Sequence, residues 1–214
     1  MIKVISFDVG GTLLKTTSDK DYSLNALALL LDKSYYEIRK VYKNVFQKQY
    51  GDFNTLVSIF CQKIGVVMSE KVVDFFHKKF ETSSNAIINP EAIDIIHMLR
   101  KHGYIIILFS NSCCLVNNDL NELHGMIDYE FYSYNIGYTK NEKESYEIIE
   151  NKLGYKANEF LHVGDNLNSD YYSPINNGWY ALYYGNDSEV HSINNLNEIG
   201  SYLNEINTDY NKDK

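Results

Sequence analysis

The side chains best suited to chemistry in this sequence are carboxylates, a hydroxyl and an ammonium group: Asp8, Ser110, Lys140, Asp165 and Asp170. The first two and Asp165 come at the ends of apolar segments, Asp170 lies five residues after Asp165, and Lys140 stands just before a predicted helix. Asp8 ends the apolar, partly β-branched run 2–7, which predicts a buried strand. In an open parallel sheet, ligands bind outside the carboxyl ends of the strands. We therefore expect Asp8 to lie where a substrate or a metal ion can reach it.

The loop after Asp8 contains Gly10 and Gly11, followed by Thr12. Glycine lets the backbone approach a ligand closely, and the Thr12 hydroxyl can turn back into the loop. Taken alone, this pattern is equally typical of a simple capped loop. What favours a functional site is that the strands predicted at 104–109 and 160–163 also end in polar residues, Ser110-Asn111 and Gly164-Asp165.

The predicted elements divide the chain into a mixed part and a helical part. Helical periodicity without a convincing strand runs through residues 16–84, with helices expected over 24–31, 35–50, 53–64 and 69–80. Further helices are expected over 90–102, 115–123, 142–153, 174–177 and 194–203, and strands over 104–109, 127–132, 160–163 and, as the last strand, 179–183. The polar end from residue 204 is expected to fray.

This order predicts an α/β protein with a doubly wound, Rossmann-like parallel sheet core and an inserted α-helical domain. The predicted core comprises residues 1–15 and 85–214, and the predicted helical cap domain comprises residues 16–84. The chain of 214 residues is 44% apolar and 14% aromatic, which is enough to bury a sizeable core.

Composition also limits the partners. The net charge of −8 argues against a general nucleic-acid surface, and it means that any phosphate site must be locally positive. The three cysteines lack metal-binding spacing and are expected to be reduced thiols of a cytoplasmic protein. Neither a signal peptide nor a membrane span is expected, so the expected partner is a small molecule rather than nucleic acid or membrane.

The order and spacing of four segments resemble the haloacid dehalogenase superfamily over essentially the whole chain. The segments are FDVGGTLL, ILFSNS, GYTKNEKESY and HVGDNLNSD. The positions that match the family's motifs are Asp8, Gly11, Thr12, Leu13, Ser110, Asn111, Lys140, Asp165 and Asp170. The predicted helical region lies where many members of the family insert a cap domain.

The resemblance implies a Mg²⁺-dependent phosphatase that acts on a small phosphorylated metabolite. Asp8 would attack the phosphoryl group and form an aspartyl-phosphate, with Ser110 and Lys140 as its catalytic partners. The implied Mg²⁺ ligands are the carboxylates of Asp8, Asp165 and Asp170 and the backbone carbonyl of Gly10. The residues expected to contact the substrate are Gly11, Thr12, Ser110, Asn111 and Lys140. Substrate choice would come from the cap, with Tyr50, Phe53 and Asn54 as loop candidates.

One position departs from the family pattern. Phosphatases of the family usually carry a second aspartate two residues after the nucleophile, and this position is Gly10 here. That aspartate protonates the leaving oxygen and later activates water, and such acid–base help is worth about 10²–10⁴-fold in rate. Its absence predicts an intact metal site with impaired proton transfer.

Three explanations of Gly10 remain open at this point. The enzyme could act on good leaving groups such as acyl phosphates, or a cap residue could supply the acid, with Tyr22, Lys43, Lys48 and Tyr50 as candidates. Alternatively, the chain is a catalytically weak phosphate- and Mg²⁺-binding protein with a regulatory or scaffolding role. Dehalogenation is the least favoured chemistry, because dehalogenase relatives do not use the metal, whereas GDNLNSD keeps the carboxylate pair.

Overall fold

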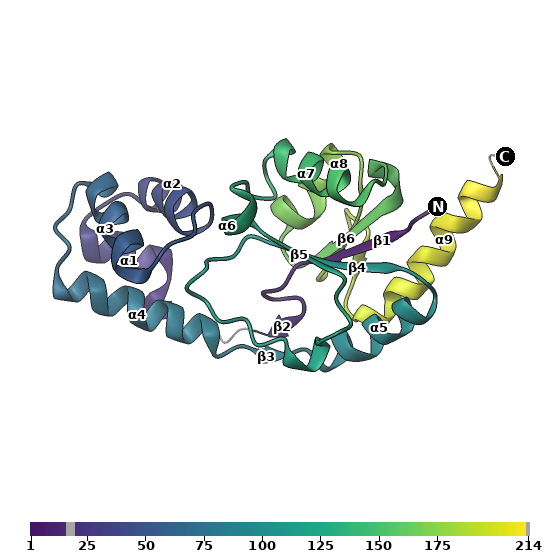
Figure 1. Cartoon of the computed structure of the whole chain (residues 1–214), viewed down its shortest axis with the longest axis horizontal. Coiled ribbons are helices and arrows are strands. Elements are labelled where there is room, and N and C mark those ends of the chain that lie inside the picture. The colour runs from purple at the N-terminus through teal and green to yellow at the C-terminus, as the bar shows by residue number, and fades with distance from the viewer. Residues whose placement is uncertain (16–19, 213–214) are drawn as a thin grey trace.

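A six-stranded parallel sheet forms the centre of the computed structural model, which describes residues 1–15 and 20–212 (Figure 1). The strand order is β5-β4-β1-β6-β7-β8, and every neighbouring pair is parallel. The strands are β1 (Val4–Phe7), β4 (Ile105–Ser110), β5 (Tyr129–Tyr132), β6 (Phe160–Gly164), β7 (Tyr180–Tyr184) and β8 (Ser192–Ile193). The predicted doubly wound, Rossmann-like sheet is therefore confirmed.

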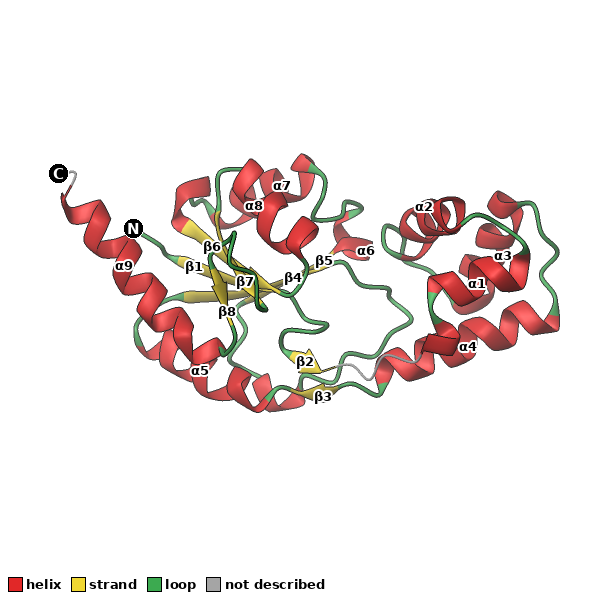
Figure 2. Ribbon diagram, turned by 180° about the vertical axis from the view of Figure 1, so that it is seen from behind, coloured by secondary structure: helices red, strands yellow, loops and turns green. Residues whose placement is uncertain are grey.

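Helices cover both faces of this sheet (Figure 2). On one face lie α5 (Pro90–Lys101) and α9 (Ile199–Lys212), and on the other lie α7 (Lys143–Leu153) and α8 (Ser173–Asn176). Alternate side chains of β1 point to opposite faces. Ile5 and Phe7 join the core under α5 and α9, and Val4 joins the core that contains Trp179. Both faces are buried, so the strands are almost continuously apolar.

The strand register places the predicted site residues at one edge. Phe7, the last residue of β1, is level with Leu108 on β4 and Val163 on β6. The chain therefore leaves β1, β4 and β6 at nearly the same height. Asp8, Ser110 and the residue after Gly164 are brought together by this register.

Four helices, which we call the helical region, pack around a second hydrophobic core. They are α1 (Leu24–Leu31), α2 (Tyr35–Phe46), α3 (Phe53–Ile64) and α4 (Glu70–Ser84). Phe46 lies at the centre of this core, with its ring centroid 4.9 Å from that of Phe76 and 5.4 Å from that of Phe80. Ser23, Ser34 and Asp52 cap the first three helices, each accepting a backbone N–H.

A short antiparallel pair of strands, β2 (Leu14–Lys15) and β3 (Ile87–Ile88), lies at the two points where the chain passes between the sheet and the helical region. These strands stand next to the predicted domain boundaries after residues 15 and 84. Residues 16–19, where the predicted cap domain begins, lie outside the described residues. The division into two domains stays a prediction.

Several predicted elements need correction. The segment 115–123 is not a helix: only Asn121–Leu123 forms a 3₁₀ turn. Leu115 and Val116 are apolar because they pack against the core of the helical region, and the Asn-Asn-Asp run that follows disfavours a helix. The strand at 179–183 is not the last, because β8 pairs with β7. The final helix continues to Lys212 instead of fraying from residue 204.

The remaining elements are short. They are α6 (Ser133–Ile136), the 3₁₀ turns Lys20–Tyr22, Ala157–Glu159 and Leu196–Glu198, and the π-helical turn Leu167–Tyr172. Among the described residues, no helix has both the length and the apolar character that crossing a membrane requires.

Candidate active site

Asp8 is the first residue after β1, and the backbone fixes its place at the carboxyl edge of the sheet. Its N–H donates to the carbonyl of Val163 over 2.9 Å, and the residue is only 7% exposed. The chain then turns back through Gly11, which has a φ of +86°. A Cβ atom on Gly11 would lie 2.0 Å from Oδ2 of Asp165, so a side chain here would displace that carboxylate in addition to being strained at this φ.

Lys140 bridges two of the carboxylates. Its Nζ lies 2.5 Å from Oδ1 of Asp8 and 2.6 Å from Oδ1 of Asp170, and the lysine is 1% exposed. Burying an ammonium group is costly unless it is paired and hydrogen-bonded. The two contacts supply that pairing, and they connect the loop before α7 to the ends of β1 and β6.

The backbone of Lys140 is held as firmly as its side chain. Its N–H donates to Oδ1 of Asn111 over 2.9 Å, and its carbonyl accepts from the hydroxyl of Tyr146 over 2.8 Å and from that of Ser173. Asn111 therefore positions the lysine loop through its side chain. From the sequence we expect Asn111 to contact the substrate, whereas its side-chain oxygen here accepts from the backbone of Lys140.

Asp170 belongs to the π-helical turn after β6. Its Oδ2 accepts the N–H of Asn166 over 2.9 Å, and the Ser169 hydroxyl donates to Oδ1 over 3.0 Å. Behind it, Nε2 of the buried His162 lies 3.5 Å from Oδ1, and Nδ1 of the same ring is 2.8 Å from the Ser6 hydroxyl. These contacts orient the Asp170 carboxylate toward Lys140.

The buried charges shift one another's pKa values. Burial raises the pKa of Asp8, and the charge of Asp170 adds to this effect while Lys140 offsets part of it. Burial acts in the same direction on Asp170, but contacts with Lys140 and His162 outweigh it and hold its pKa below the usual range. The two carboxylates likewise outweigh burial at Lys140 and raise its pKa, so the lysine stays charged.

Asp165 is the exposed member of the carboxylate group. Partial removal from water, followed by the negative charges of Asp8 and Asp170, raises its pKa to about 7. A third carboxylate therefore ionises only with difficulty beside the other two. A bound cation would relieve this repulsion.

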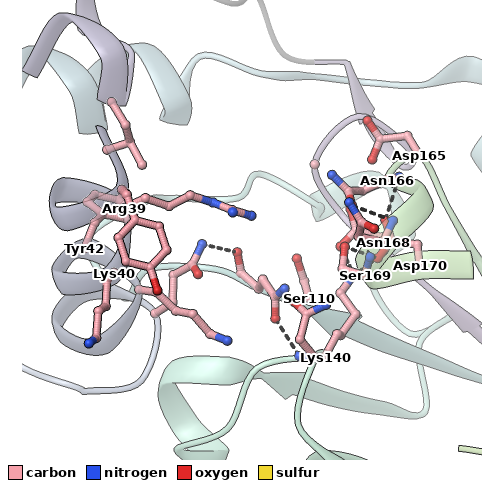
Figure 3. Close-up of a pocket in the computed structure, with 18 residues that line it drawn as sticks. Arg39, Lys40, Tyr42, Ser110, Lys140, Asp165, Asn166, Asn168, Ser169 and Asp170 are labelled. Atoms are coloured by element: carbon pink, nitrogen blue, oxygen red, sulfur yellow. Dashed lines mark hydrogen bonds and ion pairs between the residues drawn. The ribbon is translucent and has the colours of Figure 1, made fainter. Parts of the chain in front are cut away.

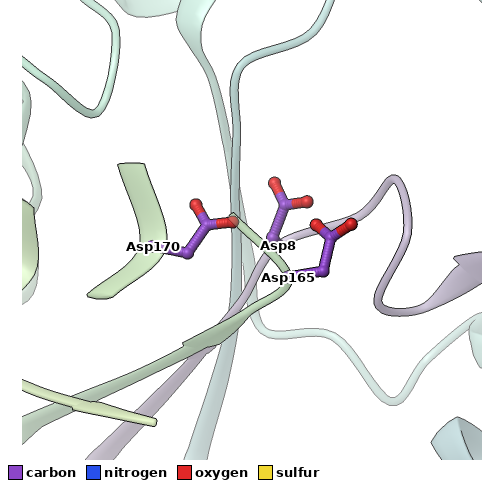
Figure 4. A group of neighbouring side chains, drawn as sticks. All are labelled: Asp8, Asp165 and Asp170. Atoms are coloured by element: carbon purple, nitrogen blue, oxygen red, sulfur yellow. The ribbon is translucent and has the colours of Figure 1, made fainter. Parts of the chain in front are cut away.

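The three aspartates form a cluster that fits a hard divalent cation (Figure 4). One oxygen from each of Asp8, Asp165 and Asp170 lies within 4.8 Å of the others. The group contains oxygen donors and no histidine or cysteine, which suits Mg²⁺ better than Zn²⁺. Gly10 borders the same space. The residues present therefore fit the metal that the sequence suggested.

A cleft of about 740 Å³ separates this cluster from helix α2 (Figure 3). The sheet side contributes the carboxylates and Ser110, and α2 contributes Tyr36, Arg39 and Lys43. The cleft is large enough for a small metabolite. The wall formed by the sheet side carries the three carboxylates, and the wall formed by α2 carries positive charge.

The structure brings most of the predicted site residues to this cleft. Those that line it are Asp8, Gly10, Ser110, Asn111, Lys140, Asp165 and Asp170. Gly11 and Thr12 are not part of the lining. Thr12 is fully buried and its hydroxyl has no hydrogen-bond partner among the described residues, so it is not placed to contact a substrate. Its role as a substrate-binding residue stays a prediction without support from the geometry.

Some residues of the cleft were missed from the sequence. Tyr50, Phe53 and Asn54, expected as specificity residues, do not line it. Arg39 of α2, which the sequence pattern does not single out, lines it, as does Lys43, which was considered only as a replacement acid. Phe53 instead begins α3 and stacks on His77, with ring centroids 3.8 Å apart. The periodicity predicts a helix over 35–50, which the structure ends at Phe46, but the pattern does not tell which face of that helix meets the cleft.

Comparison with known proteins places the fold in a family. The model for haloacid dehalogenase-like hydrolases matches residues 2–176. The chain belongs to this family. A search of curated proteins found no match.

Solved structures with a similar fold include both dehalogenases and phosphatases. A 2-haloacid dehalogenase from Pseudomonas syringae is 16% identical with a TM-score of 0.63, covering 96% of this chain and 99% of its own. A predicted phosphoglycolate phosphatase from Haemophilus somnus is 16% identical with a TM-score of 0.60, covering 94% and 98%. A family enzyme from Bacteroides thetaiotaomicron, in complex with magnesium and inorganic phosphate, is 16% identical with a TM-score of 0.60, covering 88% and 98%.

The close approach at Gly11 gives a first prediction. We expect Gly11→Ala to lower the free energy of unfolding by at least about 1–2 kcal/mol, because a side chain is strained at this φ and would meet Asp165. Chemical denaturation measures the loss. Gly10→Ala is the matched control, since a Cβ there has no atom within 4 Å and the change should stay below about 0.5 kcal/mol. Equal losses in the two variants would contradict this account of the loop.

The raised pKa of Asp165 gives a second prediction. Below about pH 7 this carboxyl carries a proton in the metal-free protein, and a cation must displace it. We expect the affinity for Mg²⁺ to increase with pH by about tenfold per unit below pH 7 and to level off above it. Titration calorimetry at about pH 6 and about pH 8 would measure the difference. Equal affinities at the two pH values would show that Asp165 does not bind the cation as a carboxylate.

Proposed function

We propose that the protein is a Mg²⁺-dependent phosphatase that hydrolyses a small phosphorylated metabolite through an aspartyl-phosphate intermediate. The observation that carries the proposal is the Asp8 carboxylate at the end of β1, 2.5 Å from Nζ of Lys140 and grouped with two further aspartates. The Bacteroides enzyme of the same fold, in complex with magnesium and inorganic phosphate, supports it.

In this proposal Asp8 is the nucleophile. Lys140 contacts Oδ1, which leaves Oδ2 to attack phosphorus. A bond forms between Oδ2 and phosphorus as the bond to the leaving oxygen breaks, and water then attacks phosphorus and releases Asp8 and inorganic phosphate. Lys140 offsets part of the effect by which burial raises the pKa of Asp8, and it places a positive charge beside the phosphoryl oxygens.

Two further groups complete the phosphoryl site. Ser110 ends β4, is 5% exposed and borders the cleft, so its hydroxyl can donate to a phosphoryl oxygen. Mg²⁺ would be held by the carboxylates of Asp8, Asp165 and Asp170 and the carbonyl of Gly10, and when bound it would neutralise the charge between nucleophile and substrate.

The protein lacks the usual acid beside the nucleophile. Gly10 borders the cleft without a side chain, and of the cap residues considered as replacements only Lys43 lines the cleft. Lys48 contacts Glu142, and Lys43 itself lies 3.7 Å from the same glutamate. Tyr42 also lines the cleft, but burial raises the pKa of its hydroxyl and makes it a poor acid. We infer that the preferred substrates have leaving groups that need little protonation, such as acyl phosphates.

Gly10 also favours a second candidate, a catalytically weak protein of the same fold that binds phosphate and Mg²⁺. Binding needs the charges of the cluster but not the missing acid. The two candidates differ in turnover, and a panel of substrates separates them.

We expect phosphate release from acetyl phosphate and p-nitrophenyl phosphate to require Mg²⁺, to stop with chelator and to fall by at least about 10³-fold in Asp8→Asn, because the nucleophile is lost. A haloacid in the same panel tests the other chemistry of the family. Chelator-insensitive halide release would replace the phosphatase proposal with dehalogenation. Mg²⁺ and phosphate binding without turnover of any substrate would favour the weak binding protein.

The empty position at Gly10 allows the missing acid to be restored. We expect Gly10→Asp to raise turnover of alkyl phosphates by about 10²–10⁴-fold, while acetyl phosphate changes little because its leaving group needs no proton. Room for the new side chain is available, since a Cβ at Gly10 has no neighbour within 4 Å. Gly10→Asn is the control with similar shape and no acid. An equal response to Asp and Asn would contradict an acid–base explanation.

A further inference from the structure

The side of helix α2 that faces the acidic cluster is basic. Tyr36, Arg39 and Lys43 follow one another at spacings of three and four residues, which places them on the same side of the helix, and all three border the cleft. The chain as a whole has a net charge of −8, so a basic wall here runs against its general composition. Its position opposite the phosphoryl site points to a ligand rather than to solubility.

Contacts across the cleft hold α2 in this position. The Gln47 amide donates to the backbone carbonyl of Asn111 over 3.4 Å. Lys48 contacts Glu142, and Nζ of Lys43 lies 3.7 Å from Oε2 of the same residue. Glu142 also accepts hydrogen bonds from Thr139, and its pKa falls to about 2 because these contacts outweigh its partial burial. The glutamate is therefore a charged anchor next to the Lys140 loop.

The cationic side chains around the cleft differ in whether they already form an ion pair with a carboxylate. Lys140 is paired with two aspartates, and Lys43 and Lys48 share Glu142. Arg39 has no acidic partner in the described part of the chain. Figure 3 shows its guanidinium extended across the cleft toward the carboxylates, whereas the ammonium of the neighbouring Lys40 is turned away from them.

Given the proposed phosphatase function, on which this inference rests, we propose that the substrate carries a second oxyanion remote from its phosphoryl group, and that Arg39 binds it. A guanidinium presents a planar fork of donors that matches a carboxylate or a second phosphate. The phosphoryl group lies against Asp8, Ser110 and Lys140, and the rest of the substrate spans the cleft of about 740 Å³ to α2. The substrate class is thus a phosphorylated carboxylic acid or a bisphosphate.

A binding experiment without turnover separates the two ends of the substrate. Three probes are titrated calorimetrically into the Mg²⁺-loaded protein: an alkyl phosphonate, a phosphonate of the same length that ends in a carboxylate, and one that ends in a second phosphonate. The last two carry an acidic group at each end, and we call them the doubly charged probes. We expect the unmodified protein to prefer a doubly charged probe, and Arg39→Ala to weaken that probe by about 10- to 100-fold, because a charged hydrogen bond is lost. The simple alkyl phosphonate should change less than about twofold.

Matched variants assign the effect to the guanidinium. Lys40→Ala removes the same charge from the next residue of α2 and should leave the preference for the doubly charged probes intact. Arg39→Lys keeps the charge but not the planar fork and should restore only part of the affinity. Which of the two doubly charged probes responds more strongly to Arg39→Ala identifies the second oxyanion as carboxylate or phosphate.

The outcomes distinguish this inference from the proposed function. If Arg39→Ala weakens the alkyl phosphonate as much as the doubly charged probes, Arg39 contacts the phosphoryl group and the second subsite is overturned. If it weakens none of them, the subsite is overturned while Asp8-dependent, chelator-sensitive turnover of a simple monoester still supports the phosphatase. If the unmodified protein binds no phosphonate better than another, the second subsite is overturned, and the turnover assay alone decides the phosphatase proposal.

Discussion

The contact of Lys140 with Asp8 and Asp170 is the interaction on which the rest of the site depends. All three residues are buried, and an unpaired buried charge costs on the order of several kcal/mol. Each charge is therefore tolerated only because the other two are present. The three residues come from the end of β1, the loop before α7 and the π-helical turn after β6, so this contact also fixes how those segments meet.

The same contact leaves the charge of the site unbalanced. One ammonium group faces three carboxylates. Together with burial, the repulsion among the carboxylates raises the pKa of Asp165 to about 7. A site that is short of positive charge accepts a cation readily, and a dianionic phosphoryl group adds to that need. In the proposed phosphatase, metal binding and phosphate binding are therefore linked by electrostatics. The basic side of α2 does not neutralise the three aspartates directly, because it lies across the cleft from them.

Much of the sheet side of the site could be predicted from the sequence, because parallel strands end at one edge. Asp8, Ser110 and Asp165 each follow an apolar run, and this local pattern is enough to place them together. Arg39 could not be found this way, since its role depends on which face of α2 meets the sheet. The error at 115–123 has a similar cause: Leu115 is apolar because it contacts the helical region, and a contact between distant segments leaves no local pattern.

In phosphatases of the family, the position of Gly10 usually contributes a backbone carbonyl to the metal and a side chain that transfers a proton, and here only the first is present. The backbone at this position still borders the three aspartates, so the proposed metal site is complete, whereas the side chain that would move a proton is absent. As a phosphatase, a site of this kind would stabilise the phosphoryl group but could not help a poor leaving group to depart. Selectivity must then come from the leaving group itself and from contacts made by the rest of the substrate. Such contacts are available on α2, which is held over the cleft by Glu142 and Gln47 and directs an unmatched guanidinium into it.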